Sequence, residues 1–389
     1  MEKTGDKNKD ESKESEGGEK RKAGYHLIRE GLVTAQVPIA EKVSREMEVF
    51  YNPVMQCNRD VSVLVLKALW KLGKAPRKGW TIASPMAGSG VRECRFLSEL
   101  PAGAVAQLSA NDLSPRAVAL IKKNLSLNKK RFTCRAVTVT CTEANHFLLG
   151  AGGFSYIDID PFGTPNPFLD AACKRLHRYG VLGVTATDTS ALAGTYPNAC
   201  RRKYWATPMR NHLMHEVGLR ILARKVQLIG AQYEKALIPI YSYAKDHYMR
   251  IFFLCKPGKA AVDDVLAQHA FLHFNQRTLS TRAATSNRGA ADVLVAGPLW
   301  TGALWDPALA RVLAEVNAEE NDDARLQKFL DTLAAEATAP VLGFYPFNLV
   351  RQVLKRAPLK KRELLKRTGV WPTHLEGNAV RASRRSLLF

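Results

Sequence analysis

Two carboxylates, a proline and an aromatic ring follow one another in the segment Tyr156–Gly163. Side chains of a strand point to alternate faces, so Asp158 and Asp160 are expected on one face, with Pro161 ending the strand. Open parallel α/β sheets bind ligands beyond the carboxyl ends of their strands, where Asp160 and Phe162 would lie. A carboxylate that accepts amino hydrogens, beside a ring that stacks on a base, suits methylation of an exocyclic amino group. The same residues also fit a buried strand ending in a turn, with Asp160 capping the next helix.

A turn of small residues lies within residues 81–97, between a predicted strand and a predicted helix. Gly88 and Gly90 allow the backbone to approach a ligand closely, and the helix that follows offers free amide groups to it. Such a turn occurs in every doubly wound fold and is weak evidence alone. Asp112 ends a second predicted strand at about the spacing, roughly 20 residues, at which an acid reaches ribose hydroxyls. Glu143 follows a third strand.

A second candidate region precedes the glycine turn. Phe50 and the next tyrosine stand before an Asn-Pro turn signal, and an apolar helix is predicted at Val61–Leu72 with Asn58 or Asp60 as its cap. One interpretation is a capped helix with aromatic residues packed beneath it. The other is a lid over a cofactor cleft, in which Phe50 stacks on a base and Arg59 reaches a carboxylate.

Strands and helices must alternate to position these residues. The predicted strands are 81–84, 105–110, 136–141, 154–160 and 180–187, and predicted helices include 115–128, 168–176 and 213–228. This alternation predicts a parallel sheet, which an antiparallel pair at 237–243 and 248–254 closes. A short strand or hairpin is expected within 25–34. Acids after successive strands describe an S-adenosylmethionine fold better than a dinucleotide dehydrogenase.

Basic and aromatic residues are interleaved after this sheet. Arg201, Arg202 and Lys203 adjoin Tyr204 and Trp205, which suits a nucleic-acid groove where phosphates give affinity and rings stack on bases. A solvated helix face is the alternative. Lys256-Pro-Gly marks a domain boundary, beyond which a turn-rich join is expected at 297–302 and an acidic helical scaffold at 304–337. Basic helices at 348–356 and 360–368, with a wing-like stretch that Arg381, Arg384 and Arg385 follow, suggest a winged-helix-like module.

The length and charge of the chain narrow the range of possible binding partners. The chain has 389 residues, which suggests two domains, and a formal net charge of +21. The tail 1–22 has equal numbers of acidic and basic residues and is expected to be disordered, so the folded part carries the excess. That charge favours nucleic acid over an anionic membrane. Seven cysteines without a CxxC pair fit reduced thiols in an intracellular protein. No membrane span or signal sequence is expected. His212 and His215 form no recognisable metal site.

With these motifs in place, the sequence resembles the archaeal and eukaryotic tRNA (guanine-26) dimethyltransferases from about Gly31 to the C-terminus. The motifs that carry the resemblance stand in one order along the chain: 50–53 with 58–60, 158–163, 185–188, 196–204, 245–248 and 373–377. The resemblance implies transfer of two methyl groups in succession to the exocyclic amino nitrogen of guanosine 26 in tRNA. It implies S-adenosylmethionine as cofactor and tRNA as partner. The residues themselves indicate no metal site, membrane segment or obligatory protein partner.

The resemblance also assigns roles to residues. Asp160 would be the catalytic acceptor, Phe50 and Phe162 would flank a flipped guanine, and tRNA would meet the basic stretch. The residues implied to hold the cofactor are Arg59, Arg92, Asp112, Glu143 and Ala144, with Gly88 and Gly90 in the turn. The chain departs from the pattern at two places. Ser84 closes the first strand, where many methyltransferases have an acid, and the zinc-ligating cysteines of some members are absent.

The sequence thus predicts an α/β, Rossmann-like methyltransferase sheet with a smaller C-terminal α+β domain. The expected units are the tail at 1–22, a catalytic domain at 23–257 and a tRNA-binding domain at 258–389. An archaeal source would imply the cytoplasm, and a eukaryotic source leaves the nucleus or an organelle open. Two alternatives remain at this stage: an amino-methyltransferase for another tRNA guanosine or for DNA, and a non-catalytic tRNA-binding protein with a methyltransferase fold.

Overall fold

A seven-stranded sheet forms the centre of the molecule. The structure, a computed structural model, describes residues 24–39, 49–134 and 136–389, so the tail predicted to be disordered lies outside it. The strand order is β5-β4-β3-β6-β7-β9-β8. The strands are β3 Trp80–Ser84, β4 Val105–Asp112, β5 Val137–Cys141, β6 Phe154–Ile159, β7 Leu176–Ala186, β8 Lys235–Lys245 and β9 Tyr248–Pro257. Neighbours from β5 to β7 are parallel, whereas β9 is antiparallel to β7 and β8, which confirms the predicted arrangement.

The strand order reverses between β3 and β6. From β3 the chain proceeds outward through β4 and β5, and it then returns to place β6 on the other side of β3. Such a reversal opens a crevice at the carboxyl ends of the two strands, because their connections leave in opposite directions. The glycine turn follows β3, and Asp160 follows β6, so the topology brings these two predicted features to one crevice.

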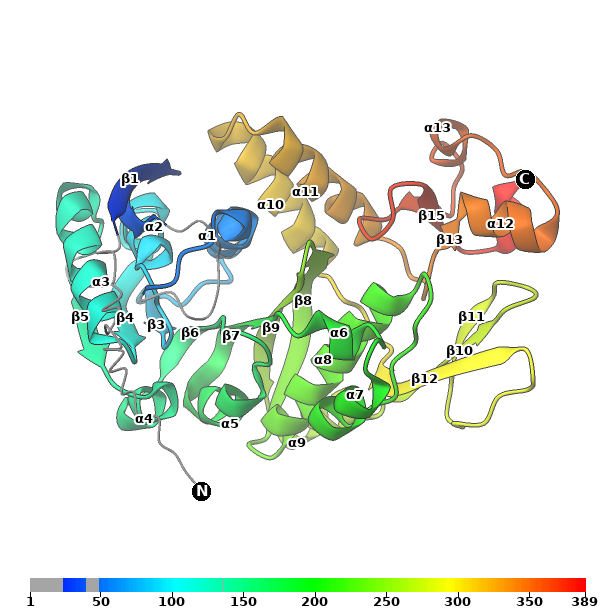
Figure 1. Cartoon of the computed structure of the whole chain (residues 1–389), viewed down its shortest axis with the longest axis horizontal. Helices are drawn as coiled ribbons and strands as arrows, with labels where there is room; N and C mark the ends of the chain where they lie inside the picture. Colours follow the sequence, from blue (N-terminus) through cyan, green and yellow to red (C-terminus); the bar gives the residue numbers. More distant parts are fainter. Residues whose placement is uncertain (1–23, 40–48, 135) are drawn as a thin grey trace, which may run out of the picture.

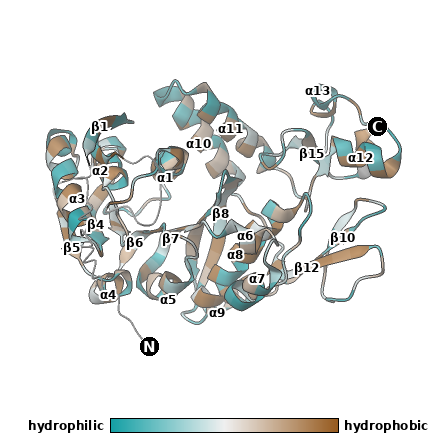
Figure 2. Ribbon diagram, viewed as in Figure 1, coloured by the Kyte–Doolittle hydropathy of each residue, from teal (hydrophilic) through white to brown (hydrophobic). Residues whose placement is uncertain are grey.

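Helices cover both faces of the sheet (Figure 1). The first layer contains α1 Gln56–Lys71, α2 Val91–Glu99 and α3 Pro115–Asn128, and the second contains α4 Ala144–Gly150, α5 Asn166–Arg175 and α8 Met214–Ala231. The sequence of α3 explains its position: Ser114 caps it, Pro115 starts it, and Ile121 is buried against the glycine turn. Figure 2 shows the expected mixture of hydrophilic and hydrophobic residues along this helix.

The start of α1 differs from the prediction. The helix begins at Gln56 rather than Val61, and neither Asn58 nor Asp60 caps it. Instead, Asn52 caps a single 3-10 turn before it by accepting a hydrogen bond from the Val54 amide at 3.0 Å. The polar residues of the first turns of α1 look like caps in the sequence, but they are buried and paired with other elements.

The remaining elements lie around this core. They are β1 Tyr25–Glu30, β2 Val33–Pro38, α6 Thr189–Leu192, α7 Pro197–Tyr204, α9 Lys259–Leu266, β10 His269–Asn275, β11 Thr281–Ala284, β12 Val293–Trp300, α10 Pro307–Glu320, α11 Ala324–Glu336, β13 Tyr345–Pro346, α12 Phe347–Leu354, α13 Lys361–Leu364, β14 Val370–Pro372 and β15 Ala379–Ala382. The hairpin β1–β2 confirms one of the two expectations for its segment. The join expected at 297–302 is wrong, because β12 continues through it to Trp300.

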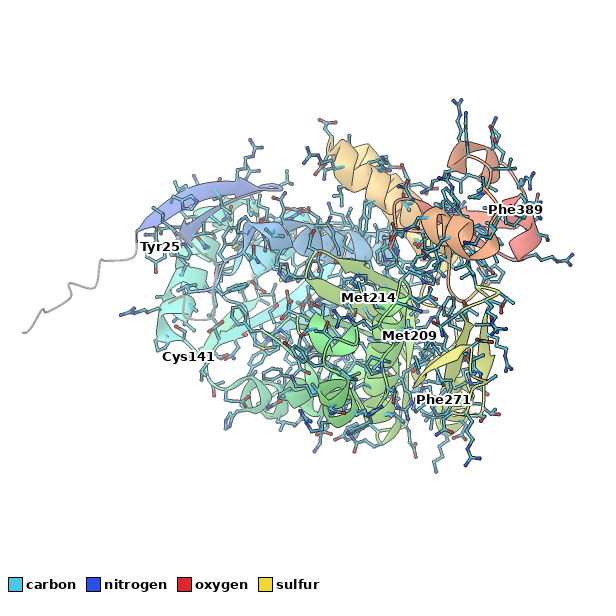
Figure 3. The ribbon with its side chains drawn as sticks, turned by 45° about the vertical axis from the view of Figure 1, so that its right-hand side comes forward. Tyr25, Cys141, Met209, Met214, Phe271 and Phe389 are labelled. Carbon is cyan, nitrogen blue, oxygen red and sulfur yellow. The ribbon has the colours of Figure 1, made fainter. Side chains whose placement is uncertain are left out.

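The C-terminal part is a small α+β assembly, as predicted. Its three-stranded sheet has the order β13-β15-β14, and α12 and α13 flank it. The second basic helix spans only 361–364, shorter than predicted. Figure 3 marks this part with Phe389 and the separate sheet β11-β10-β12 with Phe271, at the end of the molecule opposite Cys141 of β5. None of the helices in the described residues has the length and apolar character that crossing a bilayer requires.

Candidate active site

A cavity of about 490 Å³ opens at the crevice between β3 and β6. Most of its lining comes from three stretches of chain: the turn before α1 with Arg59, the glycine turn with the start of α2, and the loop after β6. Thr187 and His247 complete it. The predicted site residues in its lining are Phe50, Arg59, Gly88, Arg92, Asp160 and Phe162. Its volume suits a ligand the size of a nucleoside cofactor. The fold therefore gathers six of the thirteen predicted site residues around one cavity.

Asp160 is held at the cavity wall by Arg92. The guanidinium of Arg92 donates through Nη2 to Asp160 Oδ2, while its Nη1 donates to Ser62 Oγ at 2.7 Å and Asn58 Oδ1 at 2.9 Å. The Asp160 side chain keeps 18% exposure. Among the described residues, no hydrogen bond engages its Oδ1. Arg92, predicted as a cofactor ligand, is thus seen orienting the predicted catalytic carboxylate.

Asp158 shares a face with Asp160, but it is buried. Arg250 of β9 donates to both of its oxygens at 3.0 and 2.7 Å, and the Tyr156 hydroxyl donates to it at 2.6 Å. Burial opposes ionisation, yet Arg250 and Arg92 lower the pKa of Asp158 to about 2. Asp158 is therefore ionised in the folded chain, and its negative charge helps to hold the Arg92 guanidinium in place.

The loop after β6 presents an aromatic ring to the cavity. Gly163 ties the loop to β7, because its amide donates to Thr187 Oγ1 at 2.6 Å and its carbonyl accepts from the Thr187 amide at 2.9 Å. Phe162 is 43% exposed, and its ring meets that of Phe50 edge to face with centroids 4.2 Å apart. Pro165 precedes α5 as its N-cap residue, so the interpretation of Asp160 as a helix cap is wrong.

The two predicted glycines serve different purposes. Gly88 has φ +55°, and a Cβ there would lie 3.0 Å from the Phe50 carbonyl oxygen, so the turn needs glycine to meet the segment that carries Phe50. Gly90 does not line the cavity; a Cβ there would press against the Cα of Ile121 on α3 at 3.1 Å. Asp112 fixes the turn, since its Oδ2 accepts from the Gly88 amide at 2.9 Å.

The other predicted cofactor residues are Glu143 and Ala144, which follow β5, and Arg59, which lies on α1. Glu143 caps α4 by accepting from the His146 amide at 2.9 Å, with Ala144 buried behind it, and neither residue lines the cavity. Arg59 does line it, but two of its nitrogens bind Glu30 at 2.7 and 2.6 Å. Sequence reasoning missed Asn111, whose side chain joins these strand ends by donating to the carbonyls following β3 and β5.

A buried carboxylate, Glu93, also lines the cavity and was missed by the sequence analysis. It lies in the first turn of α2 and is 1% exposed. Burial raises the pKa of Glu93 to about 7, although the nearby Ser84 hydroxyl and the Arg92 guanidinium favour the charged form. The sequence signal that could have revealed Glu93 is the presence of an acid just after the glycine turn, together with the absence of an acid at the strand end occupied by Ser84.

The basic stretch lies on α7, beside this cavity rather than in it. Arg201, Arg202 and Lys203 are exposed, and Lys203 Nζ lies 3.3 Å from Asp188 Oδ2, directly after the cavity residue Thr187. Half-exposed Trp205 completes the surface. Within the described residues, no group of three or more histidine, cysteine, aspartate or glutamate side chains could hold a metal ion.

A doubly wound sheet with one antiparallel strand, a glycine turn and an Asp-Pro-Phe loop at its switch point define an S-adenosylmethionine-dependent methyltransferase. Residues 31–385 match the family described as N2,N2-dimethylguanosine tRNA methyltransferase, and the chain belongs to that family. The sequence-based recognition, fold class and cofactor are thereby confirmed.

Relatives support this assignment. The tRNA (guanine(26)-N(2)/guanine(27)-N(2))-dimethyltransferase of Aquifex aeolicus is 36% identical over 85% of each chain. The tRNA (guanine(26)-N(2))-dimethyltransferase of Methanothermobacter thermautotrophicus is 36% identical over 87% of this chain and 89% of its own. The solved structure of Trm1 from Pyrococcus horikoshii with S-adenosyl-L-methionine superposes with a TM-score of 0.80 at 29% identity, covering 92% of this chain and 97% of that one.

Proposed function

We propose that this chain transfers methyl groups from S-adenosylmethionine to N2 of guanosine 26 in tRNA, first one and then a second. Family membership supports the reaction class and the tRNA substrate, and the names of its relatives support position 26. The observation that carries the proposal is the position of Asp160. Its carboxylate stands at the cavity wall beside Phe162 and is held there by Arg92.

The cavity fits the cofactor. Gly88 of the glycine turn lines the cavity, so the backbone can come close to a ligand there, and buried Glu93 Oε2 lacks a hydrogen-bond partner among the described residues. Gly88 and Arg59 would line the bound cofactor, while Asp112 and Glu143 at the neighbouring strand ends would reach its ribose and base. When bound, the cofactor supplies a methyl group activated by a sulfonium.

The residues after β6 would act on the guanine. Its amino lone pair is delocalised into the ring, and a hydrogen bond from the amino group to Asp160 would localise that pair for attack. The new N2–carbon bond forms as the carbon–sulfur bond breaks, and the N2 proton passes to Asp160. Phe50 and Phe162 touch in this structure, so a base would have to separate the two rings before it stacks on them. Stacking on an aromatic side chain stabilises a bound base by about 1–3 kcal/mol.

The exposed face of α7 would hold the tRNA backbone near the cavity. Lys203 contacts Asp188, whose neighbour Thr187 lines the cavity, and Arg201 and Arg202 precede Lys203 on the same helix. Phosphate contacts of this kind provide salt-dependent affinity and no sequence specificity. The net charge of +21 is consistent with such a partner.

Nucleoside mass spectrometry tests the proposal. Unmodified tRNA is incubated with protein and S-adenosylmethionine, digested and analysed, and fragment mapping locates the product. We expect N2-methylguanosine to appear first, followed by N2,N2-dimethylguanosine, at position 26. Asp160→Asn should lower kcat by about 10²- to 10⁴-fold and leave tRNA affinity unchanged, because the amide keeps the shape but cannot take the proton.

Asp170→Asn provides the matched control. Asp170 is an exposed carboxylate of α5 outside the cavity lining, so the same chemical change there should leave kcat unchanged. Wild-type rate in Asp160→Asn would exclude the catalytic role of Asp160. Product at position 27 as well would extend the target, as the name of the Aquifex relative describes for that enzyme. No methylated guanosine from the wild-type chain would favour a tRNA-binding protein without catalysis.

A further inference from the structure

The first strand of the sheet ends without a carboxylate. Ser84 closes β3, is 3% exposed, and its hydroxyl has no hydrogen-bond partner among the described residues. This strand end lies at the switch point, directly before the glycine turn that borders the cavity. A ligand that carries an ammonium group would meet no anion from β3 here.

Glu93 brings a carboxylate to the same place from the opposite side of the turn. It occupies the first turn of α2, lines the cavity, and its Oε2 is buried without a hydrogen-bond partner in the described part of the chain. The Ser84 hydroxyl lies close enough to favour the charged form of Glu93, but forms no well-directed hydrogen bond with it. A buried acceptor of this kind is unfavourable unless a donor reaches it.

The groups around Glu93 do not supply that donor. Arg92 faces it from α2, but this guanidinium already donates to Asp160, Asn58 and Ser62. Asp158 of β6 adds negative charge nearby, which opposes ionisation of Glu93. The described side chains around Glu93 thus leave its Oε2 available to a cation that carries hydrogens to donate.

We propose that Glu93 binds the α-ammonium group of S-adenosylmethionine and replaces the strand-end acid that is absent at Ser84. This inference rests on the proposed function for the identity of the cofactor. The ammonium carries both a positive charge and three N–H donors, whereas the sulfonium has a charge but no donor. The ribose hydroxyls are left to Asp112, at the next strand end.

Calorimetry with three ligands tests this role in the full chain. S-adenosylhomocysteine keeps the ammonium and lacks the sulfonium, and 5′-methylthioadenosine lacks both. Glu93→Gln should weaken S-adenosylmethionine and S-adenosylhomocysteine about equally, by roughly tenfold to a hundredfold, because a charged hydrogen bond is lost. Binding of 5′-methylthioadenosine should stay unchanged.

Two controls keep the result specific. Glu99→Gln changes a carboxylate at the far end of α2 that binds Arg95 and does not line this cavity, so the three affinities should be unaltered. Unfolding in urea confirms that Glu93→Gln folds; the amide is isosteric with the carboxyl. Equal affinities of wild type and Glu93→Gln for S-adenosylmethionine, or equal losses for all three ligands, would overturn the inference. A wild-type chain that binds none of the three would instead overturn the proposed function.

Discussion

Two buried clusters of charged residues differ in whether every carboxylate has a guanidinium within ion-pair distance. The C-terminal cluster consists of Glu216 and Arg220 from α8, Glu336 from α11, Arg381 from β15 and His374. Arg381 binds Glu336 at 2.7 Å and Glu216 at 3.0 Å, Arg220 binds Glu216 at 3.0 Å, and His374 Nδ1 lies 2.6 Å from Glu336. Each carboxylate therefore has a guanidinium partner.

The pocket cluster contains Asp158, Arg250, Arg92 and Glu93, and it lacks this completeness. Asp158 is paired with both arginines, but Glu93 has no guanidinium within ion-pair distance among the described residues. The electrostatic consequences are opposite: the pKa of Glu216 is lowered by Arg381 and Arg220 against the effect of burial, whereas burial raises that of Glu93 to about 7. The paired cluster joins helix α8 to the C-terminal sheet, and the incomplete one lies where a cationic ligand is expected.

The largest predicted effect comes from breaking the C-terminal cluster. Arg381→Met leaves Glu216 and Glu336 short of their shared cation in a dry interior, where the loss of one partner from a buried pair costs about 3–5 kcal/mol. We expect the free energy of unfolding in urea to fall by that amount. The matched change Arg311→Met, at an exposed arginine of α10, should shift it by less than about 1 kcal/mol. A similarly small loss in Arg381→Met would mean that the cluster contributes little to holding the two parts together.

Much of the fold follows from local sequence patterns. Apolar strands that alternate with helices predicted the parallel sheet, and Asp160, Phe162 and Gly88 could be placed at the cavity because strand ends and turns are local features. The parallel sheet itself then brings the ends of β3 and β6 together. The position of these side chains along the chain was enough to predict their position in the crevice.

The pairing between distant residues could not be predicted in this way. Arg92 binds Asp160 from another element, and Glu216 of α8 meets Arg381 of β15, although many elements separate these two in the sequence. Such partners depend on how helices pack on the sheet, which a single sequence does not encode locally. The same limitation explains the misplaced start of α1, where Asn58 resembled a cap but pairs with Arg92.

The raised pKa of Glu93 in the pocket cluster predicts that the stability of the chain depends on pH. Because the folded state raises the pKa of Glu93 from 4.5 to about 7, the folded chain binds more protons than the unfolded chain between those values, and stability falls as pH rises through that range. The loss reaches at most about 3 kcal/mol, at about 1.4 kcal/mol for each pH unit. The free energy of unfolding in urea is measured at pH 5, 6, 7 and 8. It should fall more steeply with pH in the wild type than in Glu93→Gln. Parallel curves for the two proteins would contradict a raised pKa at Glu93.

The smallest effect is predicted for the removal of one hydroxyl group that donates to Asp158 in the pocket cluster. Tyr156→Phe deletes the 2.6 Å hydrogen bond to Asp158, but Arg250 still binds both carboxylate oxygens, so the anion stays compensated. We expect the free energy of unfolding to fall by only about 1 kcal/mol, the net value of a single hydrogen bond. Tyr179→Phe, at an exposed tyrosine, should change nothing measurable. A loss in Tyr156→Phe as large as that in Arg381→Met would show that the hydroxyl, rather than the arginines, keeps Asp158 ionised in the interior.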